Sequence, residues 1–176
     1  IRDSEETDAK DFASWGVDLL KYDYCNAPVD RVEAMERYAK MGRALRATNR
    51  SIVYSVCEWG QREPWKWAKQ VGGHLWRVSG DIGDIWYRDR NRVGGLHGIL
   101  NILEINAPLS EYAGPSGWND PDMLVVGIDG KSMSIGYESE GCTQEQYKSH
   151  FSLWCMMASP LPVSYTHLRA HETKAN

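Results

Sequence analysis

An aspartate stands at the end of an apolar stretch, in the sequence Leu-Leu-Lys-Tyr-Asp-Tyr-Cys of residues 19–25. If this stretch is a β-strand, Lys21 and Asp23 point to the same face, because side chains alternate along a strand. The positive charge of Lys21 would then favour the ionised form of Asp23. An ionised carboxylate that is fixed at the end of a strand is suited to act as a nucleophile.

A second carboxylate working with Asp23 would need the opposite environment, because a general acid must keep its proton near neutral pH. Two carboxylates whose environments give them different pKa values are typical of a pair in which one is the general acid and the other is the nucleophile. Arg77 lies four residues before Asp81 and would favour its ionisation, whereas an ionised Asp23 nearby would oppose it. On residue pattern alone, the partner stays open among five carboxylates: Glu58, Asp81, Asp84, Asp120 and Asp122.

Strands and helices are predicted to alternate around these carboxylates. Strands are predicted over residues 17–25, 51–60 and 74–81, and a strand followed by a loop over 117–127. Helices are predicted over residues 5–16, 31–50 and 62–73, in part of 82–110, and over 147–158, which a capping box of Thr143 and Gln146 opens. Asp30 is expected to cap the second helix, with Glu33 as its reciprocal partner. The apolar stripe of that helix is predicted to contain Val32, Met35, Ala39, Gly42 and Leu45.

Alternation with such short connections predicts the α/β class, with helices packed over a parallel sheet. A (β/α)8 TIM barrel and a doubly wound sheet both fit. Polar and aromatic residues at the C-terminal ends of four successive strands favour the barrel, because those ends converge on one mouth. The chain contains about four βα units, about half of a barrel that normally has roughly 250 residues. The 176-residue chain is therefore expected to be part of a larger domain.

Composition excludes several classes of partner. A net charge of −4 and a pI near 5.7 provide no basic field for nucleic acid. No apolar run approaches the ~18 residues of a membrane span. The four cysteines have no CxxC spacing, so no metal is expected. No G-x-G-x-x-G follows the first strand, so no dinucleotide or other cofactor is expected. Eight tryptophans and nine tyrosines suit a site that combines apolar area with polar groups, as sugar sites do.

Four segments resemble the α-galactosidase (melibiase) family, glycoside hydrolase family 27, in the family's order. They are DAKDFASWGVDLLKYDYCN, YSVCEWGQREPWKWA, WRVSGDI and AGPSGWNDPDMLVVG. The likeness extends over residues 5–161 and implies that strands 4–7 of the barrel and their helices are present. The segment SHFSLWCMMASPL is similar to the family's helix before its eighth strand.

The resemblance implies a role for each matching residue. Asp23 corresponds to the nucleophile and Asp81 to the general acid/base. Lys21, Arg77 and Asp122 correspond to side chains that contact the sugar. Cys57, Glu58 and Trp59 fall in the segment that contacts the sugar's 2-substituent. The implied reaction is retaining hydrolysis of terminal α-linked galactose, for which the two carboxyl groups must lie about 5–5.5 Å apart.

Several alternatives stay open. An α-N-acetylgalactosaminidase or a β-L-arabinopyranosidase of the same family is the nearest alternative, although the bulk of residues 57–59 favours galactose over an N-acetylated sugar. A catalytically silent carbohydrate-binding barrel belongs to a different class, and the presence of both Asp23 and Asp81 argues against it. The resemblance also implies a disulfide of Cys25 with a cysteine upstream of this sequence, and it is compatible with secretion or a periplasmic location and with homo-oligomer formation.

The last residues differ in character from the rest. Residues 163–173, VSYTHLRAHET, resemble the conceptual translation of an adaptor used in DNA sequencing libraries. We therefore expect residues 1–162 to be a partial catalytic barrel and residues 163–176 to be a tail that is not native. An open half-barrel leaves strand edges unpaired, so the chain alone is expected to be inactive and prone to aggregate.

Overall fold

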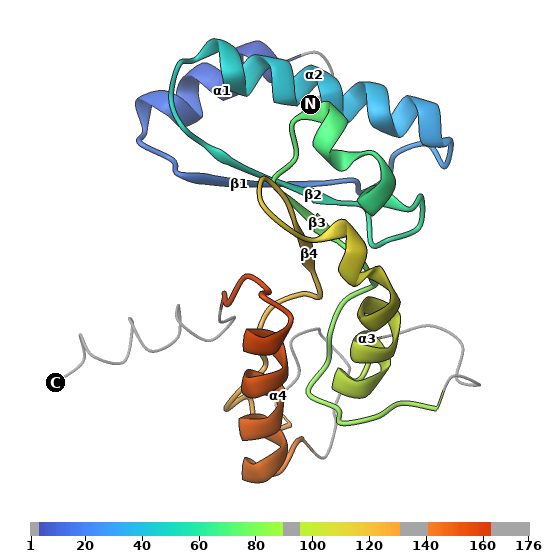
Figure 1. Cartoon of the computed structure of the whole chain (residues 1–176). Helices are drawn as coiled ribbons and strands as arrows, with labels where there is room; N and C mark the ends of the chain where they lie inside the picture. The colour runs from blue at the N-terminus through green and yellow to red at the C-terminus, as the bar shows by residue number, and fades with distance from the viewer. Residues whose placement is uncertain (1–3, 90–95, 131–140, 163–176) are drawn as a thin grey trace, which may run out of the picture. The chain divides into compact units, whose positions relative to one another are not determined.

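A computed structural model describes residues 4–89, 96–130 and 141–162 (Figure 1). The chain divides into two compact units. Unit 1 contains the described residues of 1–78 together with 111–119, and unit 2 contains the described residues of 79–110 and 120–162. The predicted tail at 163–176 lies outside the described residues.

Unit 1 is built on parallel strands that alternate with helices. Its elements are α1 (Glu5–Ser14), β1 (Leu19–Asp23), α2 (Arg31–Ala47), β2 (Val53–Cys57), η1 (Pro64–Lys66), η2 (Ala68–Val71) and β3 (Leu75–Arg77). Strand β2 pairs in parallel with both β1 and β3. With β4 (Trp118–Asp120), the sheet has the order β1-β2-β3-β4. This arrangement confirms the predicted α/β class.

Helices α1 and α2 lie side by side over one face of β1 and β2 (Figure 1). Tyr38 of α2 is fully buried there, and its hydroxyl donates to the carbonyls of Tyr22 and Cys57 at 3.1 and 2.8 Å. The predicted apolar stripe of this helix was wrong in part. Val32 is 63% exposed, and the buried face includes Ala34 and Tyr38 instead. A tyrosine whose hydroxyl has a hydrogen-bond partner is buried in the core more often than its hydropathy alone predicts.

Unit 2 contains α3 (Ile99–Asn106), α4 (Gln144–Met156) and part of the 3-10 helix η3 (Ala107–Tyr112). Its apolar core includes Ile82, Ile99, Ile102, Leu124 and Trp154. The capping box that begins α4 is confirmed, because Thr143 and Gln146 exchange side-chain to backbone hydrogen bonds. In α2, Asp30 caps as predicted, but Glu33 pairs with Arg37 rather than with the cap.

Two predicted elements are shorter than expected. The helix over 62–73 is instead the two 3-10 turns η1 and η2, because Glu63 has a φ of 54° and Trp67, with a φ of −138°, interrupts the turns. The strand at the start of 117–127 is limited to β4, because Pro121 follows it and Asp122 has a φ of 81°. No helix in the described ranges is long and apolar enough to cross a membrane.

Candidate active site

The register of unit 1 places three predicted site residues in one row. Asp23 of β1 lies opposite Cys57 of β2, and the β2–β3 register of Val56 with Trp76 places Arg77 beside Cys57. The Arg77 side chain donates from Nη1 to Cys57 Sγ at 3.9 Å, and both residues are buried. The C-terminal ends of three parallel strands therefore bring a carboxylate, a thiol and a guanidinium together.

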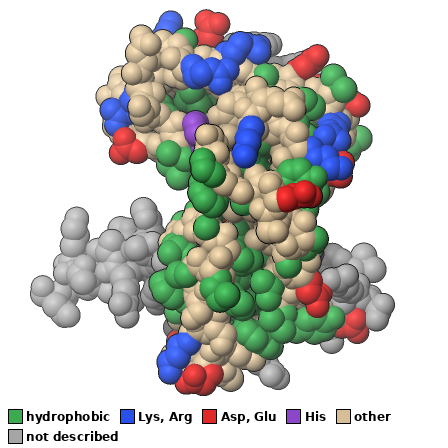
Figure 2. Space-filling view, in the orientation of Figure 1, with side chains coloured by type: hydrophobic (Ala, Val, Ile, Leu, Met, Phe, Trp, Pro, Cys, Tyr) green, Lys and Arg blue, Asp and Glu red, His purple; other side chains and the backbone are tan. Residues whose placement is uncertain are grey.

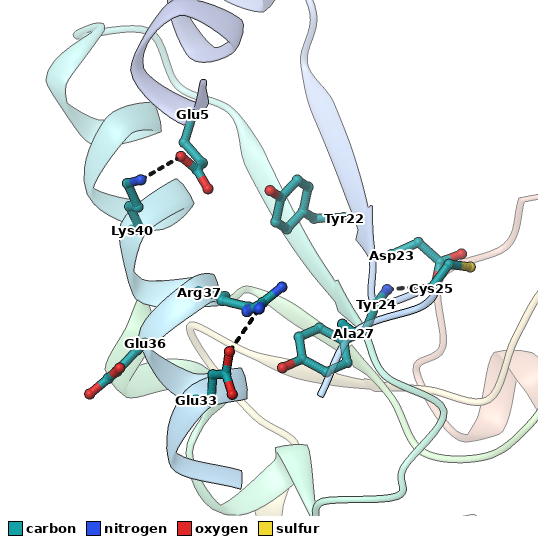
Figure 3. A pocket seen from close by; sticks show the side chains of 10 residues that line it. All are labelled: Glu5, Tyr22, Asp23, Tyr24, Cys25, Ala27, Glu33, Glu36, Arg37 and Lys40. Atoms are coloured by element: carbon teal, nitrogen blue, oxygen red, sulfur yellow. Dashed lines mark hydrogen bonds and ion pairs between the residues drawn. The ribbon is translucent and has the colours of Figure 1, made fainter. Parts of the chain in front are cut away.

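Asp23 is exposed at the end of β1, and Lys21 is exposed two residues earlier on the same face, as the alternation of β1 requires. Asp23 Oδ1 accepts a hydrogen bond from the Tyr24 amide at 2.8 Å. Figure 3 shows Tyr22 and Tyr24 pointing toward α2, whereas Asp23 points to the other side of the strand. The carboxylate is thus held by its own turn and faces away from the helix layer.

A cavity of about 420 Å³ lies on the helix side, between β1 and α2 (Figure 3). Its walls include Tyr22, Tyr24 and Arg37, and Asp23 and Cys25 also line it. Because the Asp23 side chain points away from α2, this cavity is not the site that the sequence predicted. Cys25 is exposed and has no disulfide partner among the described residues, and its disulfide with an upstream cysteine stays a prediction.

Glu58, the next residue after β2, does not join the row at the strand ends. Its side chain is fully buried, and Oε2 accepts from Arg62 Nη1 at 2.9 Å. Burial raises the pKa of Glu58, and the hydrogen bond and charge of Arg62 oppose that increase. The structure therefore places Glu58 in an internal ion pair, and its contact with sugar stays a prediction.

Arg62 is a residue that sequence reasoning missed. Besides Glu58, its guanidinium donates to the carbonyls of Val29 and Pro28 at 2.9 and 3.3 Å and lies over the Tyr24 ring at 4.8 Å. Arg62 thus links the turn after β1, which follows Asp23, to the turn after β2. The spacing of four residues between Glu58 and Arg62 was the only signal in the sequence.

The turn after β2 carries Trp59 in a left-handed backbone conformation, with a φ of 58°. Such a conformation is uncommon for a bulky side chain, so the surrounding contacts must hold it. Trp59 is partly exposed, whereas Cys57 before it is buried. Of the predicted 57–59 segment, Trp59 is therefore the side chain that solvent reaches most readily.

Unit 2 contains the other two predicted site residues. Asp81 is exposed, and its carbonyl accepts from the His97 amide at 2.7 Å. Asp122 is buried, and its carboxylate accepts from the amides of Ile82 and Met123 at 2.9 and 2.8 Å. Asp122 thus fixes the residue that directly follows Asp81. The separation of Asp23 and Asp81, which lie in different units, stays a prediction.

Burial separates the five carboxylates that the sequence left open as partners of Asp23. Four are buried and accept hydrogen bonds from protein groups, whereas Asp81 is exposed; the four are Glu58, Asp84, Asp120 and Asp122. A carboxyl group that transfers protons to a substrate must be reachable. Asp81 is the member of the set that meets this condition.

No group of three or more His, Cys, Asp or Glu side chains within the described ranges could hold a metal ion. Parallel strands whose C-terminal ends gather a carboxylate, a thiol and a guanidinium are typical of the catalytic face of a (β/α)8 barrel.

Comparison with known proteins agrees with the assignment to (β/α)8 barrel enzymes. The sequence profile of the family described as "Alpha galactosidase A" matches residues 2–176, so the chain belongs to the α-galactosidase (melibiase) family. A crystal structure of a Bacteroides fragilis protein, provisionally described as an alpha-galactosidase, is 93% identical with a TM-score of 0.85. The match covers 92% of this chain and 33% of that chain.

Two further relatives are more distant. Alpha-galactosidase A of Cellvibrio japonicus is 42% identical over 161 residues, which are 91% of this chain and 36% of the relative. The structure of the Saccharomyces cerevisiae α-galactosidase with raffinose is 34% identical with a TM-score of 0.76, covering 90% of this chain and 36% of that chain. The chain thus spans about a third of the length of these relatives, and its four-stranded parallel sheet is part of their (β/α)8 barrel.

Proposed function

We propose that the whole protein is a retaining glycoside hydrolase that removes terminal α-linked galactose from oligosaccharides or glycoconjugates. The observation that carries the proposal is the exposure of Asp23 and Asp81, while the other candidate carboxylates are buried and hydrogen-bonded. Membership of the family supports the substrate class, as does the raffinose bound to the yeast relative.

In the proposed first step, an oxygen of Asp23 attacks the anomeric carbon as the glycosidic C–O bond breaks. Asp81 gives its proton to the departing oxygen, and a covalent galactosyl-enzyme forms. In the second step, water attacks the same carbon and gives a proton to Asp81, which releases galactose and restores the Asp23 carboxylate. The sugar leaves with the α configuration that it had in the substrate.

The proposed substrate contacts extend the row at the strand ends. Lys21 shares the face of Asp23, and Arg77 and Cys57 lie in contact beside it. Trp59 is the proposed contact for the 2-substituent of the sugar. Asp122 supports the Asp81 segment, and Glu58 supports the turn that carries Trp59, so we assign both of these carboxylates to positioning.

Kinetics of the whole protein test the proposal. Asp23→Asn and Asp81→Asn should each reduce turnover of an aryl α-galactoside by several orders of magnitude, and proton NMR should detect α-galactose before β-galactose with the unsubstituted enzyme. Glu36→Gln, at an exposed carboxylate on α2, is the matched control and should leave turnover unchanged.

The same assay separates the alternatives. Faster turnover of an N-acetyl-α-galactosaminide or a β-L-arabinopyranoside would reassign the substrate within the family. Binding of galactose with no turnover by the unsubstituted protein would identify a carbohydrate-binding barrel and overturn the proposed hydrolysis.

A further inference from the structure

Asp84 of unit 2 is a buried carboxylate that accepts hydrogen bonds from three separate positions in the chain. It is 5% exposed, and Oδ2 accepts from the Tyr147 hydroxyl at 2.6 Å and from the Gly130 amide at 2.8 Å. Oδ1 accepts from the Cys142 amide at 3.0 Å. One side chain therefore fixes the backbone at Gly130, the backbone before α4 and a side chain of α4 itself.

The position of Asp84 in the sequence gives these contacts a consequence for Asp81. Only two residues separate them, and both are tightly fixed. Ile82 is fully buried and its amide donates to Asp122, whereas the Gly83 amide donates to the His97 carbonyl at 2.8 Å. A Cβ atom added at Gly83 would lie 2.8 Å from Leu96 Cβ, so this segment packs closely against Leu96. The backbone after Asp81 is thus tied to Asp122 and His97, and Asp84 anchors its far end.

We propose that Asp84 is a positioning residue for the general acid, holding the segment of Asp81 against the residues that follow β4 and against α4. This inference rests on the proposed function, because it assigns Asp84 a role in the protonation step. Asp84 itself is buried and acts through the backbone of residues 81–84.

The neighbouring donors are suited to hold such a carboxylate. Burial and the hydrogen bond to Asp84 both raise the pKa of the Tyr147 phenol. Burial, followed by the hydrogen bond and the charge of Asp84, raises the pKa of the Cys142 thiol to about 12. Both groups therefore keep their protons across the neutral range, and the phenol stays a donor to Asp84.

Positioning of a general acid has a kinetic signature that a loss of folded protein lacks. A sugar alkoxide is a poor leaving group and needs its proton as the bond breaks, whereas a dinitrophenolate leaves with little help. Attack by Asp23 is common to both substrates. A displaced Asp81 should therefore slow cleavage of a disaccharide far more than cleavage of a dinitrophenyl galactoside.

The experiment compares these two substrates in the whole protein with Asp84→Asn. The amide keeps the size of the side chain, but its NH2 group faces N–H and O–H donors instead of accepting from them. We expect kcat/KM for an α-galactosyl disaccharide to fall on the order of 100-fold, the scale that a displacement of about 1 Å produces. For 2,4-dinitrophenyl α-galactoside, which needs little protonation, we expect a loss below about fivefold.

Two further variants complete the design. Tyr147→Phe removes one of the three donors and should give the same substrate dependence at smaller size, so it tests the idea even if Asp84→Asn fails to fold. Asp129→Asn is the matched control: this residue is exposed, lies next to Gly130 and has a φ of 54°, which asparagine tolerates. Asp129→Asn should leave kcat/KM unchanged for both substrates.

The outcomes are distinct. Equal losses on both substrates, in Asp84→Asn or in Tyr147→Phe, would show a general structural defect and overturn the positioning role. No loss on either substrate would overturn it as well. If the unsubstituted protein turned over neither galactoside, the proposed function would fail and the role of Asp84 with it. A selective loss on the disaccharide supports both.

Discussion

The two units hold their buried carboxylates in different ways. In unit 1, Glu58 is held by the guanidinium of Arg62, and in Figure 2 many of the Lys, Arg, Asp and Glu side chains gather over this unit. In unit 2, Asp84 is held by two backbone amides and a phenol, and Figure 2 shows a largely hydrophobic surface. One carboxylate depends on a side chain, and the other depends largely on the fold of the backbone.

This difference determines how each carboxylate can be replaced. An ion pair can be removed as a pair, because two uncharged side chains of similar shape can fill the same volume. Backbone amides cannot be substituted, so loss of Asp84 leaves its donors without an acceptor. Arg62, the partner of Glu58, lies over the ring of Tyr24, which follows Asp23, and Asp84 stands three residues after Asp81.

The largest effect is expected for Arg62→Met in the whole protein. Glu58 is fully buried and Arg62 is 8% exposed, so the substitution leaves an uncompensated charge in the interior. We expect the free energy of unfolding to fall by about 3–5 kcal/mol, measured by urea unfolding. The double variant Glu58→Gln/Arg62→Met should recover much of this loss, because the buried charge is gone.

An exposed ion pair in the same region provides the control. Arg31 contacts Glu63 at 3.1 Å with both side chains about two-fifths exposed, so Arg31→Met should cost less than about 1 kcal/mol. If Arg31→Met cost as much as Arg62→Met, burial would not be the cause of the difference. A double variant no more stable than Arg62→Met would contradict the proposed removal of the pair.

The second-largest expected effect is a change in stability with pH, and it arises in unit 2. His150 of α4 is fully buried, accepts from the Val125 amide through Nε2 and packs edge-on against Trp154. Burial lowers the pKa of His150 from 6.5 to about 4, opposed by the charge of Asp84. Between these values the unfolded chain binds a proton that the folded chain does not.

Stability must therefore fall as pH decreases from about 6.5 to about 4, by at most ~3 kcal/mol for this residue, and level off below that range. Urea unfolding of the whole protein at several pH values measures the slope. His150→Gln keeps an acceptor for the Val125 amide but cannot titrate, so the difference between variant and parent should shrink as pH falls. A difference that is constant with pH would exclude His150 as its source.

Much of the fold could be predicted from the sequence, because local signals agree with the final structure in both units. The helix predicted over 5–16 forms as α1, which ends shortly before Gly16 with its φ of 78°, and Thr143 with Gln146 begins α4, as predicted. The burial of α2 was predicted less well, since hydropathy favoured Val32 over Tyr38. A phenol enters the core when a backbone acceptor is in reach, and its acceptors at Tyr22 and Cys57 come from two other elements.

The candidate site shows the same limit. Motif resemblance predicts roles for Asp23, Asp81, Arg77 and the 57–59 segment, but it could not tell which side chains lie at the surface. The proposal that Glu58 and Asp122 are positioning residues rests on partners that are 4 and 40 residues away in the sequence. A contact over 40 residues leaves no periodic signal in the chain.

A smaller effect is expected for Tyr38→Phe in unit 1. The substitution removes the hydroxyl that bridges the carbonyls of Tyr22 and Cys57, near the ends of β1 and β2. Leaving a buried acceptor without its donor costs about 1–3 kcal/mol, measured by urea unfolding. Tyr54→Phe is a matched control with a single acceptor, the Tyr38 carbonyl at 3.1 Å, and should cost less. Equal costs would argue that the bridge between the two strands adds nothing.

The smallest expected effects compare a helix cap in each unit. Asp30 accepts from the Glu33 amide at 2.9 Å at the start of α2, and Thr143 accepts from the Gln146 amide at 3.3 Å at the start of α4. Asp30→Ala and Thr143→Ala should each lower the free energy of unfolding by about 1 kcal/mol.

If the whole protein unfolds as one cooperative unit, both substitutions lower the temperature of the same thermal transition by similar amounts. If the two units unfold separately, each cap lowers only the transition of its own unit, because distant and independent sites do not share a change in free energy. Calorimetry of both variants distinguishes these results, and two separate transitions would mean that Asp23 and Asp81 lie on independently stable parts of the barrel.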